Sequence, residues 1–291
     1  MTQRFRGTIV ADRLIAKELV GYNYQRRGNV FYVEPVNGLD TNSGSSRSKP
    51  FKTFAKAVSV AADWDIIVLA GGDYEENDIS ITQRGLKIMG DGTSGATRGP
   101  VLFIGDGTFI LQLRNHDIEI AGCAFYQTTA YPCVQAAILS EHIWRTHIHD
   151  CGFSGGGAGE LGISMGAVAA EAPYAVIEDC RFYNLSDTGI RLNSSAMIVR
   201  RNVFSVKDGA KGVEVVPNST SRPDKFILDN KFVSPGGTTA VGITVTNTPS
   251  AGELMVDGNH FVNFADNDHC ISKRTGYTGL NYLGVTAIAI T

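Results

Sequence analysis

Ile148-His-Asp-Cys-Gly-Phe153 is one of six segments in this chain that share a pattern of an aliphatic residue, a short polar pair and then phenylalanine. The six phenylalanines are spaced 28, 29, 22, 28 and 29 residues apart. Self-similarity at such a period is typical of repeat proteins. The other five segments are Ile120-Ala-Gly-Cys-Ala-Phe125, Ile177-Glu-Asp-Cys-Arg-Phe182, Val199-Arg-Arg-Asn-Val-Phe204, Ile227-Leu-Asp-Asn-Lys-Phe232 and Val256-Asp-Gly-Asn-His-Phe261.

Two further apolar segments accompany the phenylalanine motif in the later repeats. After it comes a glycine followed by alternating apolar and polar residues, as in Gly189-Ile-Arg-Leu192. Alternation of period two indicates a strand with one buried face. Before it comes a short apolar patch such as Met197-Ile-Val199. Each repeat therefore contains about three short strands separated by turns, which is the content of one coil of a three-sided parallel β-helix.

Other repeat architectures fit these segments less well. A helical repeat needs long stretches of 3.6-residue periodicity, which are missing, and a propeller blade needs about 40 residues or more. One coil cannot bury its inner face alone, so neighbouring coils must stack around a continuous core. We therefore predict an all-β parallel β-helix over residues 65–273, with the six phenylalanines stacked inside.

The position two residues before each of these phenylalanines is cysteine in the first three segments and asparagine in the last three. Stacked asparagines can hydrogen-bond to one another along a column. We predict an asparagine ladder that continues into a column of buried, reduced and metal-free thiols, and a metal or redox thiol cluster is the alternative. The column contains Cys123, Cys151, Cys180, Asn202, Asn230 and Asn259.

The N-terminal third carries a different pattern. Phe31-Tyr-Val33 leads to a loop rich in Asn, Gly, Asp and Ser, then to Lys49-Pro-Phe-Lys-Thr-Phe-Ala-Lys-Ala-Val58 and Gly71-Gly-Asp-Tyr-Glu75. This order of strand, loop, Pro-Phe-x-Thr helix start and Gly-x-Tyr turn resembles the entry to pectate-lyase-like β-helix proteins. The resemblance implies a right-handed, single-stranded parallel β-helix. It leaves function open, because enzymes, adhesins and phage spikes all use this fold.

A short helix in this region would cover the open end of the first coil. Pro50 suits the first turn of a helix, and Phe54, Ala57, Val58 and Ala61 recur at three- and four-residue spacing on one apolar face. We expect four segments: a particle-attachment segment over residues 1–29, a cap over 30–64, the β-helix over 65–273, and a closing or oligomer-contact segment over 274–291.

Composition limits the classes of partner. The net charge of −3 argues against a nucleic-acid footprint, which needs a strongly basic face. No apolar run approaches the length of a membrane span. The basic start Met1-Thr-Gln-Arg-Phe-Arg6 is not followed by an apolar core, so we expect no signal peptide and synthesis in a host cytoplasm.

Asp150 and Asp179 are candidate catalytic carboxylates, because they occupy equivalent positions in adjacent repeats. Neighbouring carboxylates can share a proton, bind a cation or cleave a glycosidic bond. The alternative is a structural role, since Asp is favoured in tight turns and Asp229 occupies the same position in a later repeat.

Outward-facing polar residues supply the other candidates. His147 and His149 flank Ile148, so both would point outward and could hold a metal ion, assisted by Asp150 or Glu141. Ordinary exposed polar positions are the alternative, and we expect no cofactor. Arg191 and Glu214 alternate with apolar residues and are candidates for glycan binding. Calcium-binding lyases of this fold carry clustered Asp residues on a strand and a catalytic Arg or Lys beyond it. Arg191, Arg200 and Arg201 could match that catalytic residue, but no clear Asp-x-x-x-Asp arrangement accompanies them.

The leading hypothesis is a bacteriophage virion protein: a tail spike, fibre or surface-decoration subunit on the outside of the particle. By resemblance to phage spikes it would be a homotrimer, attached to other virion proteins through its N-terminal segment, and it would bind host-surface polysaccharide without strong cleavage. The alternatives are a polysaccharide-degrading lyase or hydrolase on the same scaffold, and a bacterial surface adhesin.

Overall fold

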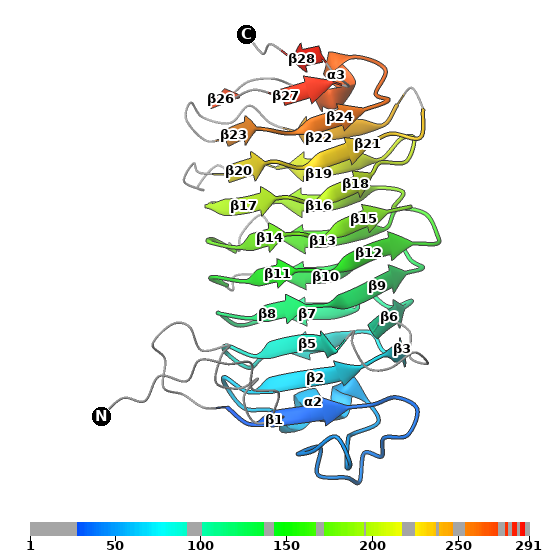
Figure 1. Cartoon of the computed structure of the whole chain (residues 1–291), viewed down its shortest axis with the longest axis vertical. Helices are drawn as coiled ribbons and strands as arrows, with labels where there is room; N and C mark the ends of the chain where they lie inside the picture. The colour runs from blue at the N-terminus through cyan, green and yellow to red at the C-terminus, as the bar shows by residue number, and fades with distance from the viewer. Residues whose placement is uncertain are drawn as a thin grey trace, which may run out of the picture.

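Three sheets of short strands wrap around one continuous core, and the chain climbs from one end of the resulting β-helix to the other (Figure 1). The strands within each sheet pair in parallel, except that β28 pairs antiparallel with β27. The predicted parallel β-helix is confirmed. The computed structural model describes residues 28–91, 101–136, 143–166, 172–194, 196–216, 225–236, 239–246, 254–272, 277–278, 281–283 and 286–288.

Sheet A runs the whole length of the β-helix, and its first strand comes from the segment predicted as the cap. Its members in spatial order are β1 (Val30–Val33), β2 (Ile66–Ala70), β5 (Lys87–Asp91), β8 (Glu119–Ala121), β11 (His147–His149), β14 (Val176–Glu178), β17 (Met197–Arg200), β20 (Lys225–Leu228), β23 (Leu254–Asp257) and β26 (Tyr277–Thr278).

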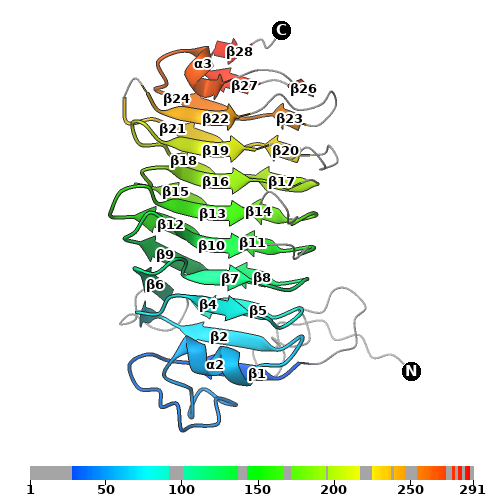
Figure 2. The same ribbon diagram turned by 180° about the vertical axis from the view of Figure 1, so that it is seen from behind.

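Sheets B and C complete each coil, and Figure 2 shows sheet C from the opposite side. Sheet B contains β3 (Gly72–Tyr74), β6 (Val101–Gly105), β9 (Cys123–Gln127), β12 (Gly152–Gly155), β15 (Arg181–Tyr183), β18 (Val203–Ser205), β21 (Lys231–Val233), β24 (His260–Val262), β27 (Asn281–Leu283) and β28 (Thr286–Ile288). Sheet C contains β4 (Ile79–Ile81), β7 (Leu111–Leu113), β10 (Pro132–Ala136), β13 (Leu161–Met165), β16 (Thr188–Leu192), β19 (Lys211–Val215), β22 (Val241–Val245) and β25 (Ile271–Ser272).

The six predicted phenylalanines form a continuous stack inside the β-helix. Neighbouring rings lie 4.7–5.1 Å apart between centroids and within 9° of parallel. Phe103 extends the stack toward the N-terminus, with its ring 5.2 Å from that of Phe125. The rings stack because each phenylalanine pairs in register with the equivalent residue of the next coil.

The same rings explain the glycine that opens the second motif. A Cβ atom added at Gly189 would lie 2.9 Å from the ring of Phe204, and one at Gly212 would lie 2.6 Å from the ring of Phe232. Such contacts are shorter than a side chain tolerates, so each ring packs directly against the glycine backbone of a neighbouring strand in sheet C. The two motifs of the repeat are therefore parts of one packing unit.

The asparagine ladder and the cysteine column are also present. Asn202 Nδ2 donates a hydrogen bond to Asn230 Oδ1, and Asn230 Nδ2 donates one to Asn259 Oδ1, each over 3.0 Å. Where asparagine gives way to cysteine, Asn202 Oδ1 accepts from the backbone N–H of Cys180 over 2.9 Å. The thiols of the column are buried, as predicted, and burial raises the pKa of the Cys123 thiol.

At the corner between sheet A and sheet B, each of six consecutive coils has one residue with left-handed backbone. These corner residues have φ between 53° and 68°. Glycine adopts this conformation without strain, and Asp tolerates it better than most residues. The corner column is Gly122, Asp150, Asp179, Arg201, Asp229 and Gly258.

Helix α2 (Phe54–Val60) closes the N-terminal end of the core, as the amphipathic pattern predicted (Figure 2). Thr53 Oγ1 accepts from the backbone N–H of Lys56 and caps the helix start. The buried ring of Phe54 meets Phe103 edge-on at 5.2 Å, so the helix packs onto the end of the stack. At the other end lies α3 (Asn267–Cys270). Within the described residues, no helix is long and apolar enough to cross a membrane.

Candidate functional site

Charged side chains gather on the outer face of sheet A, around the two histidines of β11. His147 and His149 point outward, as predicted, because Ile148 between them is fully buried. Strand pairing sets Glu119 directly opposite His147, and Glu178 directly opposite His149. We call this group the charge network, and it consists of Lys87, Glu119, His147, His149, Asp150, Glu178, Asp179, Arg200 and Arg201.

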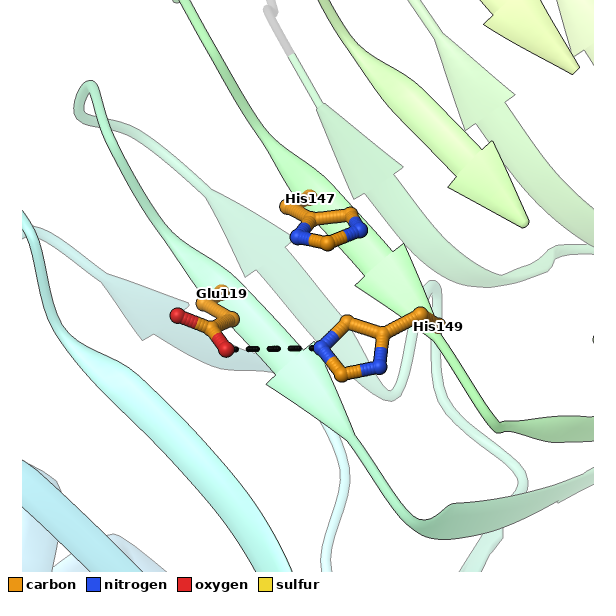
Figure 3. Close-up of side chains that lie close together, drawn as sticks. All are labelled: Glu119, His147 and His149. Atoms are coloured by element: carbon orange, nitrogen blue, oxygen red, sulfur yellow. Dashed lines mark hydrogen bonds and ion pairs between the residues drawn. The ribbon is translucent and has the colours of Figure 1, made fainter. Parts of the chain in front are cut away.

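Glu119 and His149 form the first half of the network (Figure 3). His149 Nε2 lies 3.3 Å from Glu119 Oε1, and Lys87 Nζ contacts the other carboxylate oxygen of Glu119. The hydrogen bond from His149, helped by Lys87, lowers the pKa of Glu119 to about 2 despite burial. The same hydrogen bond raises the pKa of His149 to about 9, with a further contribution from Asp150.

Glu178 organises the second half of the network. Its Oε1 lies 2.9 Å from His147 Nε2, and its Oε2 lies 2.6 Å from Arg200 Nε. Burial by itself would raise the pKa of Glu178, but the hydrogen bonds from Arg200 and His147 outweigh it and lower the pKa to about 2. Glu178 is therefore ionised, and it acts as a hydrogen-bond acceptor between two coils.

Asp150 and Asp179 occupy successive corners of the β-helix. Asp150 contacts a histidine ring, and Asp179 contacts an arginine. Asp150 Oδ2 lies 2.8 Å from His149 Nδ1. Asp179 Oδ2 lies 2.7 Å from Arg201 Nη2, and this interaction lowers the pKa of the Asp179 carboxyl group. A general acid needs a raised pKa, which Asp179 lacks, and both residues have the left-handed backbone of the corner column. The geometry favours the structural alternative for this pair.

The stability of metal-free protein should depend on pH through His149 and Glu119. The raised pKa of His149 means that its contribution is full below pH 6.5 and disappears as pH rises through about 9. The lowered pKa of Glu119 means that its contribution is full above pH 4.5 and disappears as pH falls toward about 2. We expect the fall in melting temperature between pH 6.5 and 9 to be smaller in His149→Gln than in the wild type.

The matched control for this pH series is Met255→Gln, which replaces an exposed side chain without a titratable group on the same sheet. It should keep the wild-type pH profile. A direct measurement is the NMR titration of the His149 ring in chelator-treated protein. A midpoint near 6.5 instead of about 9 would show that Glu119 does not hold the proton on His149.

The outer face of sheet C carries a second feature, a polar column with one residue from each coil. Strand register aligns these residues side by side, at about one strand spacing of ~4.8 Å. Most of them are half-buried and uncharged. The polar column consists of Ser80, Gln112, Gln135, Ser164, Arg191, Glu214, Thr244 and Ser272.

Arg191 and Glu214, the predicted binding residues, are neighbours in this column. Arg191 Nε donates to Glu214 Oε2 over 2.6 Å, and Lys211 Nζ lies 2.5 Å from Glu214 Oε1. Burial would raise the pKa of Glu214, but the hydrogen bonds from Lys211 and Arg191 lower it. Arg191 also contacts Asp187 at 3.1 Å. Both predicted residues are therefore held in place by ion pairs within the protein.

The repeats and coils correspond to a known family. A model of the family described as "Right handed beta helix region" matches residues 77–261. The chain belongs to this family. The match includes the phenylalanine stack, the asparagine ladder, the charge network and every residue of the polar column except Ser272.

Several solved structures are similar to this chain in the course of the backbone. This β-helix protein is similar to Escherichia coli YbhC, with 10% identity over 87% of this chain and 83% of that one and a TM-score of 0.50. Pectate lyase Pel9A is 12% identical over 90% of this chain and 77% of that chain, with a TM-score of 0.48. A rhamnogalacturonan lyase is 12% identical over 86% of this chain and 87% of that chain, with a TM-score of 0.45. These likenesses concern the fold alone. A search of curated proteins finds no match.

The sequence of this β-helix indicated the two histidines but not Glu119, which contacts His149 and lies opposite His147 on the neighbouring strand. The signal was available, since Glu119 precedes Ile120 as His147 precedes Ile148, and aligned repeats pair these positions. Asp150, one of the two residues predicted to assist the histidines, contacts His149. Glu141, the other predicted assistant, lies outside the described residues. Of the three arginines compared with the catalytic residue of lyases, Arg191 pairs with Asp187 and Glu214. Arg200 pairs with Glu178, and Arg201 pairs with Glu178 and Asp179.

Proposed function

We propose that this β-helix protein is a structural subunit on the outside of a bacteriophage particle and that it binds host-surface polysaccharide without cleaving it. The polar column on sheet C supports the binding half of the proposal. Its regularly spaced hydroxyl, amide and guanidinium groups offer hydrogen bonds to a chain of sugar hydroxyls laid across successive coils. Binding of this kind needs only a shallow polar surface.

The state of the carboxyl groups supports the non-cleaving half. Cleavage by a hydrolase needs one carboxyl group whose pKa is raised. In the charge network, ion pairs lower the pKa values of Glu119, Glu178 and Asp179. In the described part of the chain, burial raises the pKa of Glu76. Glu76 accepts from the backbone N–H groups of Phe54 and Ala55 at the start of α2, so its role is to cap that helix.

The binding test uses polysaccharide extracted from the surface of the host bacterium, titrated into the full chain by calorimetry. We expect Gln112→Ala/Gln135→Ala to weaken binding at least about tenfold, because two adjacent hydrogen-bonding residues of the column are lost. The matched control is Ser205→Ala/Lys231→Ala, which removes two exposed polar side chains from sheet B. Equal affinity of the wild type and both variants would exclude the polar column as the binding surface.

The cleavage test measures reducing ends and unsaturated sugars after incubation with the same polysaccharide. No turnover is expected. Turnover that disappears in Asp150→Asn or Asp179→Asn would favour the alternative function, a polysaccharide-degrading enzyme.

The particle part of the proposal rests on the resemblance of residues 1–29 to the particle-binding segment of phage tail spikes and fibres. The proposed attachment segment falls almost entirely outside the described residues. Labelling of purified particles with antibodies against the chain, followed by electron microscopy, tests this part directly. A homotrimer is expected by light scattering at micromolar concentration, and a monomer would remove the trimer from the proposal.

A further inference from the structure

Three possible metal ligands converge on the outer face of sheet A. One ligand atom from each of Glu119, His147 and His149 lies within 4.8 Å of the others. In Figure 3 the two imidazole rings and the carboxylate face a common point above β8 and β11. The ring centroids of the two histidines are 4.3 Å apart. All three residues are half-buried, so the common point is reached from solvent.

In each histidine, one ring nitrogen is within hydrogen-bond distance of a carboxylate that is not among the three possible ligands. His147 Nε2 lies 2.9 Å from Glu178 Oε1, and His149 Nδ1 lies 2.8 Å from Asp150 Oδ2. Histidines that bind metals nearly always donate their second N–H to a carboxylate, carbonyl or water, which sets the tautomer and orients the ring. The two carboxylates therefore orient the remaining ring nitrogens, His147 Nδ1 and His149 Nε2, for a shared ligand.

The backbone that carries these side chains is rigid. Glu119 and His147 face one another across the parallel pair β8 and β11, and Ile120 and Ile148 between the outward positions are fully buried. Ligands on packed strands keep their geometry better than ligands on loops. Lys87 holds one oxygen of Glu119, which leaves Oε1 directed at the histidines.

We propose that Glu119, His147 and His149 form a binding site for a divalent first-row transition metal ion such as Zn²⁺. Two imidazoles and one carboxylate are a ligand set that such ions accept, and three protein ligands leave a coordination position for water or for an oxygen of a bound molecule. An ion at the common point takes the place of the proton between His149 and Glu119, and that proton passes to solvent. The site is independent of the polar column on sheet C.

The test titrates Zn²⁺ into the chelator-treated full chain by calorimetry at neutral pH. We expect one ion per chain. His149→Ala and the nearly isosteric Glu119→Gln should each weaken binding at least about tenfold, because each removes a ligand. Asp150→Asn should weaken it roughly ten- to a hundredfold, because it removes the charge that orients His149. Asn tolerates the left-handed backbone of this corner, so the fold is kept.

The matched control is Asp179→Asn, the same substitution at the next corner, where the carboxylate pairs with Arg201 instead of a histidine. It should bind Zn²⁺ as the wild type does. Absence of binding to the wild type would overturn the proposal. So would binding by His147→Ala/His149→Ala equal to that of the wild type, which would place the ion elsewhere, or a Co²⁺ spectrum with thiolate charge-transfer bands, which would assign the ion to cysteines.

Discussion

Phe182→Ala should lower the free energy of unfolding by about 3–5 kcal/mol, the range measured for large-to-small changes at buried aromatic residues. The ring of Phe182 lies between those of Phe153 and Phe204, at centroid distances of 4.9 and 4.7 Å. It also packs against the backbone at Gly162, where an added Cβ would lie 2.9 Å from the ring. The flanking rings are held by their own strands, so they cannot close the cavity that the substitution leaves.

Chemical denaturation measures this loss, and Tyr183→Ala provides the control. Tyr183 is the next residue on the same strand, but 53% of it is exposed. Its removal should change the free energy of unfolding by only about 0.5 kcal/mol, as for most surface substitutions. Losses of similar size in the two variants would mean that the stack does not dominate the stability of the central coils.

Asn230→Ala should cost about 3 kcal/mol or more, although the side chain is small. Asn230 Oδ1 accepts from the backbone N–H and the Nδ2 of Asn202, and Asn230 Nδ2 donates to the carbonyl of Val199 and to Asn259 Oδ1. Alanine removes all four interactions in a buried column. Each buried polar group left without a partner costs about 1–3 kcal/mol.

The same denaturation experiment on Asn37→Ala supplies the comparison. Asn37 donates a single hydrogen bond to Glu34 on the exposed surface, where water replaces the lost partner. We expect a change below about 1 kcal/mol there. If Asn230→Ala loses no more than Asn37→Ala, the ladder is a consequence of stacking and does not contribute to stability.

The residues that point into the core were predictable from the sequence because they recur once per coil. The phenylalanine motif, its preceding Cys or Asn and the following glycine all face the interior, and parallel pairing stacks each type upon itself. The capping helix was predictable from the apolar face that includes Phe54 and Ala57. At these inward-facing positions, the local sequence pattern and the packing of the core require the same types of residue.

The outward-facing residues do not repeat, so their partners were decided by the tertiary structure. Glu119 bonds to His149 and His147 to Glu178 diagonally across coils, over sequence separations of 30 and 31 residues. Such diagonal contacts depend on the lateral register and on side-chain direction, which the spacing of motifs does not specify. The left-handed backbone at Asp150 is likewise a feature that only the tertiary structure shows. The inner face was thus determined by repetition, whereas the chemistry of the outer face was determined by which coils lie side by side.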